Sequence, residues 1–167
     1  MTAPGPGGSI TPPSSPDCIT GLRPFPWPLV RLLPHRSPMV LLDEGVGYDD
    51  EVAVVIAIMH PDHPFAGPDG VPAHVGIELM AQTCGVFVGA QALARGEPVR
   101  LGMLLGTRGY RAEVDWFESG DRLEVCARLV FRDAEMGVFD CTIASRTRPA
   151  VRLAVARLNV YEPPLLS

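Results

Sequence analysis

Lysine is absent from this chain of 167 residues, so its 14 basic residues are all arginine. A Walker phosphate loop and a lysine Schiff base both need an amine, and both kinds of site are therefore excluded. The arginines are spaced singly, and the formal net charge is −5. Nucleic-acid binding requires a concentrated basic surface, so we expect no nucleic-acid partner.

Several catalytic and cofactor motifs are also missing. The chain has no G-x-S-x-G nucleophile motif, no H-E-x-x-H metal motif and no G-x-G-x-x-G after a strand. Its cysteines include no C-x-x-C pair, which predicts reduced side chains that pack as small hydrophobic groups. They are Cys18, Cys84, Cys126 and Cys141. No positively charged segment precedes an apolar run at the N terminus, so we expect a cytoplasmic protein.

The length is that of about one domain, and 47% of the residues are hydrophobic, which is enough for a buried core. Residues 1–28 are dense in Pro, Gly and Ser, and repeated prolines fix φ and remove amide donors. We therefore expect a flexible leader over residues 1–28, a single domain over residues 29–162 and a tail over residues 163–167. Phe25 and Trp27 are the leader side chains suited to docking on the domain.

Short apolar runs predict strands on both sides of one long apolar segment. Met39–Asp43 and Val52–Met59 are rich in large or β-branched apolar residues and are separated by a polar turn. Residues 122–132 alternate between apolar and charged side chains, the pattern of a strand with one wet face. Further strands are predicted from about residue 101 and over residues 138–144 and 151–161.

The long apolar segment, Ala73–Ala94, contains one charged residue, and its length and composition predict a helix. It is long enough to cross a membrane, but Glu78, Gln82 and Gln91 would be costly in lipid. We therefore expect no membrane span. An antiparallel sheet wrapped around one long buried central helix satisfies the order of the elements, which gives an α+β fold.

The carboxyl group of Glu78 stands alone near the start of this apolar helix. Burial disfavours the charged form of a carboxyl group, so Glu78 could hold a proton near neutral pH and donate it. The alternative is a structural acid that caps the preceding loop or the first amides of the helix. The residues around Glu78 leave both possibilities open.

Three histidines, His60, His63 and His74, lie just before or inside the predicted helix. An imidazole is suited to removing a proton from carbon near neutral pH. Zinc binding is the weaker alternative without an H-E-x-x-H motif, and His60 and His74 would also suit ordinary surface positions. The first amides of the helix, near Ala73 and His74, have no intrahelical acceptor and would stabilise enolate charge on a thioester.

The run Leu-Pro-His-Arg-Ser-Pro-Met-Val-Leu-Leu-Asp, from Leu33 to Asp43, resembles the opening strand of bacterial β-hydroxyacyl-acyl-carrier-protein dehydratases. His63-Pro-Phe and the run from Val71 to Gln82 resemble the catalytic loop and central helix of the same enzymes. A closer resemblance is to the dehydratase subunit family of aryl polyene biosynthesis, through residues 78–86 and 101–106. The similarity covers about residues 32–161.

This resemblance implies a hot-dog fold and a homodimer, or a heterodimer with a related hot-dog subunit, with the substrate tunnel at the interface. It assigns His63 as the base that takes the proton α to the thioester. Glu78, contributed by the other subunit, would protonate the departing 3-hydroxyl, and Gln82 would orient its carboxylate. The Ala73 amide would face the thioester oxygen, with His74 beside it in the substrate-binding loop.

The implied reaction converts a 3-hydroxyacyl chain on acyl carrier protein to the trans-2-enoyl product, in a fatty-acid-like or aryl polyene pathway, without metal or cofactor. Two other functions stay open. A hot-dog thioesterase would use a helix carboxylate to activate water and would need no histidine. The chain could instead be a non-catalytic or half-site subunit of a heterodimeric dehydratase. A carrier-protein patch should be basic, with Arg95, Arg100 and Arg108 as candidates.

Overall fold

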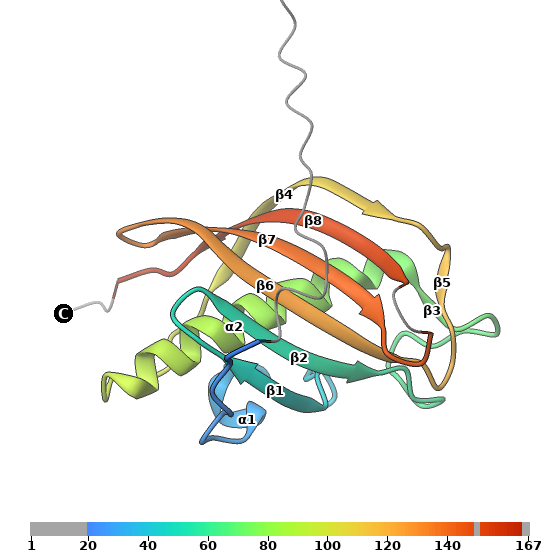
Figure 1. Cartoon of the computed structure of the whole chain (residues 1–167), viewed down its shortest axis with the longest axis horizontal. Coiled ribbons are helices and arrows are strands. Elements are labelled where there is room, and N and C mark those ends of the chain that lie inside the picture. Colours follow the sequence, from blue (N-terminus) through green and yellow to red (C-terminus); the bar gives the residue numbers. More distant parts are fainter. Residues whose placement is uncertain (1–19, 149–150, 165–167) are drawn as a thin grey trace, which may run out of the picture.

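The computed structural model describes residues 20–148 and 151–164, which form a curved sheet around one long helix (Figure 1). A short helix, α1 (Leu29–Leu32), precedes strands β1 (Glu44–Tyr48) and β2 (Val52–Ile58). A loop then leads through β3 (Val71–Pro72) and the 3₁₀ turn η2 (Ala73–Val75) into the central helix α2 (Gly76–Ala94). The remaining strands are β4 (Met103–Ala112), β5 (Trp116–Phe117), β6 (Arg122–Asp133), β7 (Met136–Ser145) and β8 (Arg152–Tyr161).

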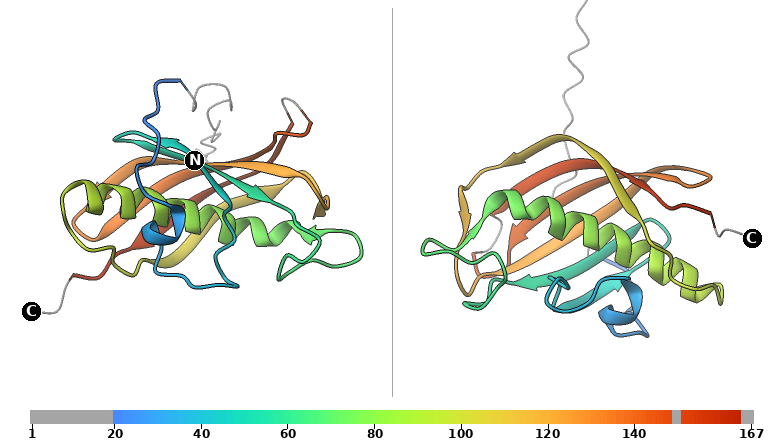
Figure 2. Two further views of the ribbon diagram at one scale, coloured as in Figure 1. Left: turned by 90° about the horizontal axis from the view of Figure 1, so that it is seen from below. Right: turned by 180° about the vertical axis from the view of Figure 1, so that it is seen from behind.

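Helix α2 lies along the inner face of the sheet (Figure 2) and contacts β2, β6, β7 and β8. Leu79, Met80 and Phe87 are fully buried in this contact, and the Phe87 ring meets Phe139 of β7 edge-on, with centroids 5.5 Å apart. Residues 73–94 pass a length and composition test for a membrane span, but here they are the core helix under the sheet. The prediction of a sheet wrapped around one buried central helix is therefore confirmed.

The sheet is antiparallel throughout, with six strands in the order β1-β2-β6-β7-β8-β4. Strand β6 differs from the predicted alternation, because all residues from Leu123 to Ala127 are buried. A small apolar cluster covers its outer face: Cys126 packs with Val52 and Val54, and Leu22 closes over them. Both faces of the first half of β6 are therefore buried.

The strand predicted over Met39–Asp43 is wrong in its position, because β1 begins only at Glu44. The reason is that a side chain of α2 forms hydrogen bonds with backbone groups of this segment, which are then not available to pair with a neighbouring strand. The amide of Leu41 donates to the side chain of Gln82, and the carbonyl of Met39 accepts from it. The segment before β1 is thus fixed to α2 rather than to the sheet.

The two edges of the sheet are finished differently. Beside β1, the backbone of Arg23 exchanges two hydrogen bonds with Tyr48, and Phe25 stacks on the Tyr48 ring at 4.9 Å. The other edge, β4, pairs only with β8 in the part of the chain that the structure describes. Four apolar side chains at or before that edge strand are exposed: Leu101, Met103, Leu104 and Leu105. An edge of this kind invites pairing with another chain.

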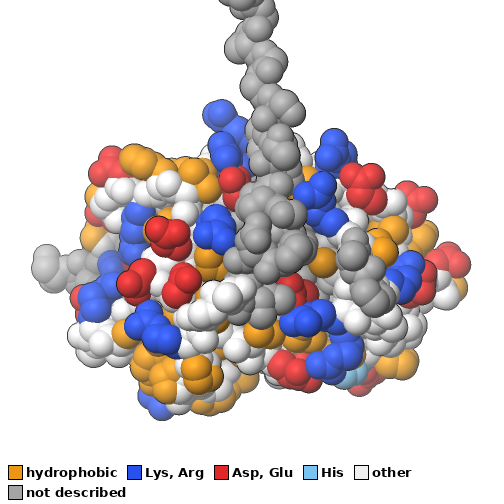
Figure 3. Space-filling view, viewed as in Figure 1, with side chains coloured by type: hydrophobic (Ala, Val, Ile, Leu, Met, Phe, Trp, Pro, Cys, Tyr) orange, Lys and Arg blue, Asp and Glu red, His pale blue; other side chains and the backbone are white. Residues whose placement is uncertain are grey.

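Charged side chains of both signs are interspersed on the outer face of the sheet (Figure 3). Many arginines are paired with carboxylates, as in Arg122–Glu44 at 2.8 Å and Arg157–Asp140 at 2.7 Å. Three cysteines, Cys84, Cys126 and Cys141, are buried and reduced, as the sequence predicts, while Cys18 lies outside the described residues. The predicted leader also lies outside them up to residue 19, so its flexibility stays a prediction.

Candidate active site

Glu78 lies in the first turn of α2, and its side chain is 38% exposed. The burial that the sequence predicts for this carboxylate is therefore only partial in a single chain. The preceding turn, η2, begins directly after the two-residue strand β3, so the start of the helix is anchored to β5 through the β3–β5 pair. The site thus stands on a rigid element rather than on a free loop.

Gln82 lies one helical turn beyond Glu78 and is completely buried. Its Nε2 donates one hydrogen bond of 2.9 Å to Glu78 Oε1 and another of 2.7 Å to the carbonyl of Met39. Its Oε1 accepts the amide of Leu41 at 3.0 Å. Both hydrogens of the side-chain amide are therefore used, and the carboxylate of Glu78 is tied to the segment before β1.

A narrow cavity of about 110 Å³ opens beside these two side chains. Its floor follows α2 through Ala81, Gly85 and Val88, and its other wall comes from the start of β4 and the end of β8. Arg100 and the buried Glu162 lie in the same lining and form an ion pair of 2.5 Å. The rest of the lining is mostly apolar, so the cavity has one polar part at Glu78 and Gln82 and another at the Arg100–Glu162 pair.

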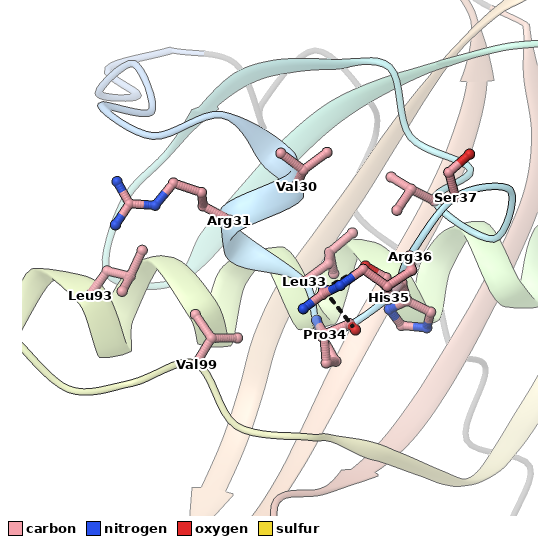
Figure 4. Close-up of a pocket in the computed structure, with 10 residues that line it drawn as sticks. Val30, Arg31, Leu33, Pro34, His35, Arg36, Ser37, Leu93 and Val99 are labelled. Atoms are coloured by element: carbon pink, nitrogen blue, oxygen red, sulfur yellow. Dashed lines mark hydrogen bonds between the residues drawn. The ribbon is translucent and has the colours of Figure 1, made fainter.

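A broader, open groove of about 750 Å³ adjoins this cavity (Figure 4). Pro34 and His35 line both hollows, so they form the wall between them. The rest of the groove lining comes from α1, the segment before β1, the end of α2 and the loop after it. It is mostly apolar, and its polar members are Arg31, Arg36 and Ser37. The Arg36 guanidinium turns back and donates to the carbonyls of Pro34 and His35.

His35 is a site residue that the sequence analysis missed as a candidate, although it belongs to the Leu33–Asp43 run. Its Nε2 lies 3.6 Å from Glu78 Oε1. The two residues are 43 positions apart in the sequence, and no local sequence pattern predicts their contact. The resemblance of the Leu-Pro-His-Arg-Ser-Pro run to known dehydratases is the one signal that could have drawn attention to it.

In this structure the hydrogen of the Ala73 amide, the predicted donor to a thioester oxygen, is engaged within the chain, and its role toward a substrate stays a prediction. The amide donates a hydrogen bond of 2.9 Å to the carbonyl of Asp115. The Ala73 carbonyl in turn accepts the hydroxyl of Tyr110, whose pKa burial raises to about 12, so the phenol stays a donor. His74 follows in η2 with an exposed side chain, and its amide lies in the first turn, where intrahelical acceptors are lacking.

His63 is only 8% exposed, and the residues that line the Glu78 cavity do not include it. Its Nδ1 accepts the amide of Phe65 at 3.1 Å, and its Nε2 is buried without a hydrogen-bond partner among the described residues. Burial lowers the pKa of His63, an effect that the nearby Asp43 and Asp62 only partly offset. With Nδ1 engaged as an acceptor, the proton of the neutral ring sits on Nε2.

This lowered pKa predicts that the chain loses stability in mild acid. Below the ordinary histidine value of 6.5 the unfolded chain binds a proton at this position and the folded chain does not. The free energy of unfolding therefore falls as the pH drops from 6.5 toward the lowered folded value, by at most about 1.4 kcal/mol per pH unit. Denaturant unfolding of the wild type and of His63→Gln, at several pH values, measures the difference. An equal pH slope in both proteins would contradict the prediction.

The remaining predicted histidine, His60, serves a structural contact. Its Nε2 lies 2.8 Å from Asp43 Oδ1, and Asp43 Oδ2 accepts the amide of Ile58 at the end of β2. Within residues 20–148 and 151–164, no group of three His, Cys, Asp or Glu side chains is placed to hold a metal ion. His60, His63 and His74 thus do not gather around one point.

A family model described as ApeP dehydratase, of the ApeP-like family, matches residues 27–167. Among solved structures, the chain is similar to one described as the dehydratase heterocomplex ApeI:P from Xenorhabdus doucetiae. The identity is 35%, the match covers 83% of this chain and 93% of the other, and the TM-score is 0.78. A search of curated proteins finds no match.

Two more distant structures share the fold alone. One is the PaaI protein of the phenylacetic acid degradation operon of E. coli, at 15% identity and a TM-score of 0.56, covering 71% of this chain and 81% of that one. The other is a hypothetical thioesterase with coenzyme A from Streptococcus pneumoniae, at 14% identity and a TM-score of 0.57, covering 74% and 88%. The antiparallel sheet around a central helix is thus a hot-dog fold, and the chain belongs to the ApeP-like dehydratase family.

Proposed function

We propose that this chain removes water from a 3-hydroxyacyl thioester, with Glu78 as the acid, in a site completed by a hot-dog partner subunit. The observation that carries the proposal is the Glu78 carboxylate in the lining of a mostly apolar cavity, with one oxygen held by the buried Gln82. A carboxyl group fixed in this way presents its second oxygen to a substrate in the cavity. Family membership supports a dehydratase reaction.

The proposed reaction needs one base and one acid. A histidine takes a proton from the carbon next to the thioester, and the electron pair forms the new carbon–carbon double bond. The bond from the third carbon to its hydroxyl oxygen breaks, and Glu78 gives that oxygen a proton, so water leaves. The histidine is then protonated and Glu78 is a carboxylate, and return of the proton to Glu78 restores the starting state.

The histidine in this scheme comes from the partner subunit. In a homodimer it is the His63 of the second copy, and in a heterodimer the related subunit supplies it. The engaged Nδ1 of His63 favours the heterodimer, because a base needs an open lone pair. The solved structure at 35% identity is itself described as a heterocomplex. The exposed apolar edge at β4 is the surface along which we expect the partner to pair.

We expect the substrate to be carried by acyl carrier protein, with its thioester arm in the open groove and its reacting carbons in the cavity. At about 750 Å³ the groove has the volume of a small-molecule site, whereas the cavity has room for the reacting end alone. Of the predicted carrier patch, Arg95 and Arg100 are already paired with Glu97 and Glu162. Arg108 is exposed on β4 without a described ion pair, but it does not line the groove. Arg31 is a better candidate, because it lines the groove and no described carboxylate lies within ion-pair distance of it.

Arg31→Glu should therefore raise the KM for a carrier-borne substrate by about 5- to 10-fold, and this effect should shrink at high salt. The same thioester on a short pantetheine-like thiol should be processed at the wild-type rate, because it lacks the acidic carrier. Arg152→Glu, an exposed charge reversal on β8 outside the groove lining, is the matched control. An equal rise in KM for both substrates would place Arg31 in substrate binding and contradict carrier docking.

Mass spectrometry of 3-hydroxyacyl carrier protein tests the function itself. The chain is incubated alone and together with a related hot-dog subunit, and loss of one water from the acyl chain is the expected result in at least one pairing. Activity that needs the second subunit, with His63→Asn still active, would identify a half-site subunit. Release of free carrier thiol without water loss would mark a thioesterase. Intact substrate under every pairing would refute the proposal.

The fatty-acid-like or aryl polyene pathway and the cytoplasmic location stay predictions.

A further inference from the structure

Two nitrogen groups lie beside the same oxygen of Glu78, and one of them donates a hydrogen bond to it. Gln82 Nε2 donates to Oε1 at 2.9 Å, and His35 Nε2 lies 3.6 Å from the same atom. Among the described residues no hydrogen bond or ion pair reaches Oε2. The surroundings of the carboxyl group are therefore asymmetric, with one oxygen enclosed by nitrogen groups and the other left for the cavity.

The environment of the His35 ring indicates which nitrogen carries the proton. Its Nδ1 is buried without a hydrogen-bond partner among the described residues. An unpaired acceptor is tolerated in a protein interior more readily than an unpaired N–H, so the neutral ring keeps its proton on Nε2. That N–H faces Glu78 Oε1. The separation of 3.6 Å is longer than a hydrogen bond, and such contacts in empty sites often tighten when substrate binds.

The loop that carries His35 is fixed on both sides. Before it, Leu32 is buried against α2 where Gly89 lies, and a Cβ at Gly89 would come within 2.2 Å of the Leu32 carbonyl oxygen. After it, Gln82 binds the backbone of Met39 and Leu41. Arg36 closes the turn onto the carbonyl of His35 itself (Figure 4). The packed backbone on both sides of His35 therefore fixes the position of the imidazole beside Glu78.

We infer that His35 is a positioning residue for the acid: with Gln82 it fixes Glu78 Oε1 as an acceptor, so that Oε2 carries the proton that is transferred. A carboxyl oxygen that accepts hydrogen bonds from two N–H groups cannot also carry the acidic hydrogen on that side. The hydrogen therefore sits on the other oxygen, which faces the cavity. His35 acts only through Glu78: it donates a hydrogen bond to the carboxyl group and neither gives nor takes a proton in the reaction. This inference rests on the proposed function of Glu78.

Three variants, assayed with the partner subunit if the wild type needs it, test the inference. His35→Ala should lower kcat by about 10- to 100-fold and leave KM within about 2-fold, because substrate still binds but the acid is misaligned. His35→Gln should recover most of the rate, within about 5-fold of the wild type, because its side-chain amide restores an N–H donor. His60→Gln, at the exposed ion pair with Asp43, is the matched control and should keep the wild-type rate.

A double-mutant cycle separates positioning from a general structural role. In a Glu78→Gln background, adding His35→Ala should lower the residual rate by less than about 2-fold, because the residue acts through a carboxyl group that is no longer present. A full additional loss there, or a His35→Gln variant as inactive as His35→Ala, would overturn the positioning role. Wild-type rates in His35→Ala would also overturn it while leaving the dehydratase proposal intact. A wild type that never releases water would overturn both.

Discussion

Glu78→Gln is expected to lower kcat for water loss by about 10²- to 10⁴-fold, the contribution usual for a positioned general acid. The glutamine amide keeps the shape of the side chain and its place beside Gln82, but it has no proton that it can transfer to a leaving hydroxyl. The KM should change little, because the cavity walls are untouched. Mass spectrometry of single time points, at saturating substrate, gives the rate.

Glu97→Gln is the control for this experiment, because Glu97 is exposed and its carboxylate pairs with Arg95 after the end of α2. It should keep the wild-type rate. A Glu78→Gln variant that retains more than about a tenth of the activity would mean that another group protonates the hydroxyl. The alternative of a purely structural acid, which the sequence left open, would then be the correct one.

Gln82→Leu is expected to lower the free energy of unfolding by about 2–6 kcal/mol and to abolish most activity. Leucine fits the buried site in size, but it leaves the Leu41 amide and the Met39 carbonyl without partners. Each unsatisfied buried group costs about 1–3 kcal/mol. A domain of this size has a total stability of about 5–15 kcal/mol, so the loss should be visible as a large shift of the denaturant midpoint.

Gln91→Leu on the same helix provides the comparison. Gln91 is partly buried and makes one side-chain hydrogen bond, 3.0 Å long, to the carbonyl of Asp49. Its replacement should cost less than about 1.5 kcal/mol and leave the rate unchanged. Equal stability losses in the two variants would show that the three hydrogen bonds of Gln82 contribute no more than the single, partly buried hydrogen bond of Gln91. A stable Gln82→Leu protein with full activity would remove Gln82 from the site.

The two proposals about the acid support each other through geometry. Gln82 lies on the same helix as Glu78 and at the spacing of one turn, so it holds Oε1 whatever the rest of the chain does. Gln82 also binds the backbone of the segment after His35, and this contact helps to place the imidazole beside the same oxygen. Loss of Gln82 should therefore misplace His35 as well, which explains why its expected effect on activity is large.

The sequence by itself determined the elements that depend on local pattern. The apolar run from Ala73 to Ala94 could only be a helix covered on most sides, and the structure has it as η2 and α2. The contact between Glu78 and Gln82 also follows from spacing, because residues four apart meet on one face of a helix. Strands β2, β6, β7 and β8 lie within about two residues of the predicted ranges, since β-branched composition and alternation are local properties.

Tertiary structure alone decided the contacts between distant segments. The start of β1 moved to Glu44 because a glutamine from α2 satisfied the backbone of the segment before it. The Ala73 amide donates to the carbonyl of Asp115, a contact that the sequence does not predict. His35, which lies 43 residues before Glu78 in the sequence, became part of the site through a packed loop. These outcomes depend on which buried polar groups find each other across the fold, and a one-dimensional pattern carries no record of that pairing.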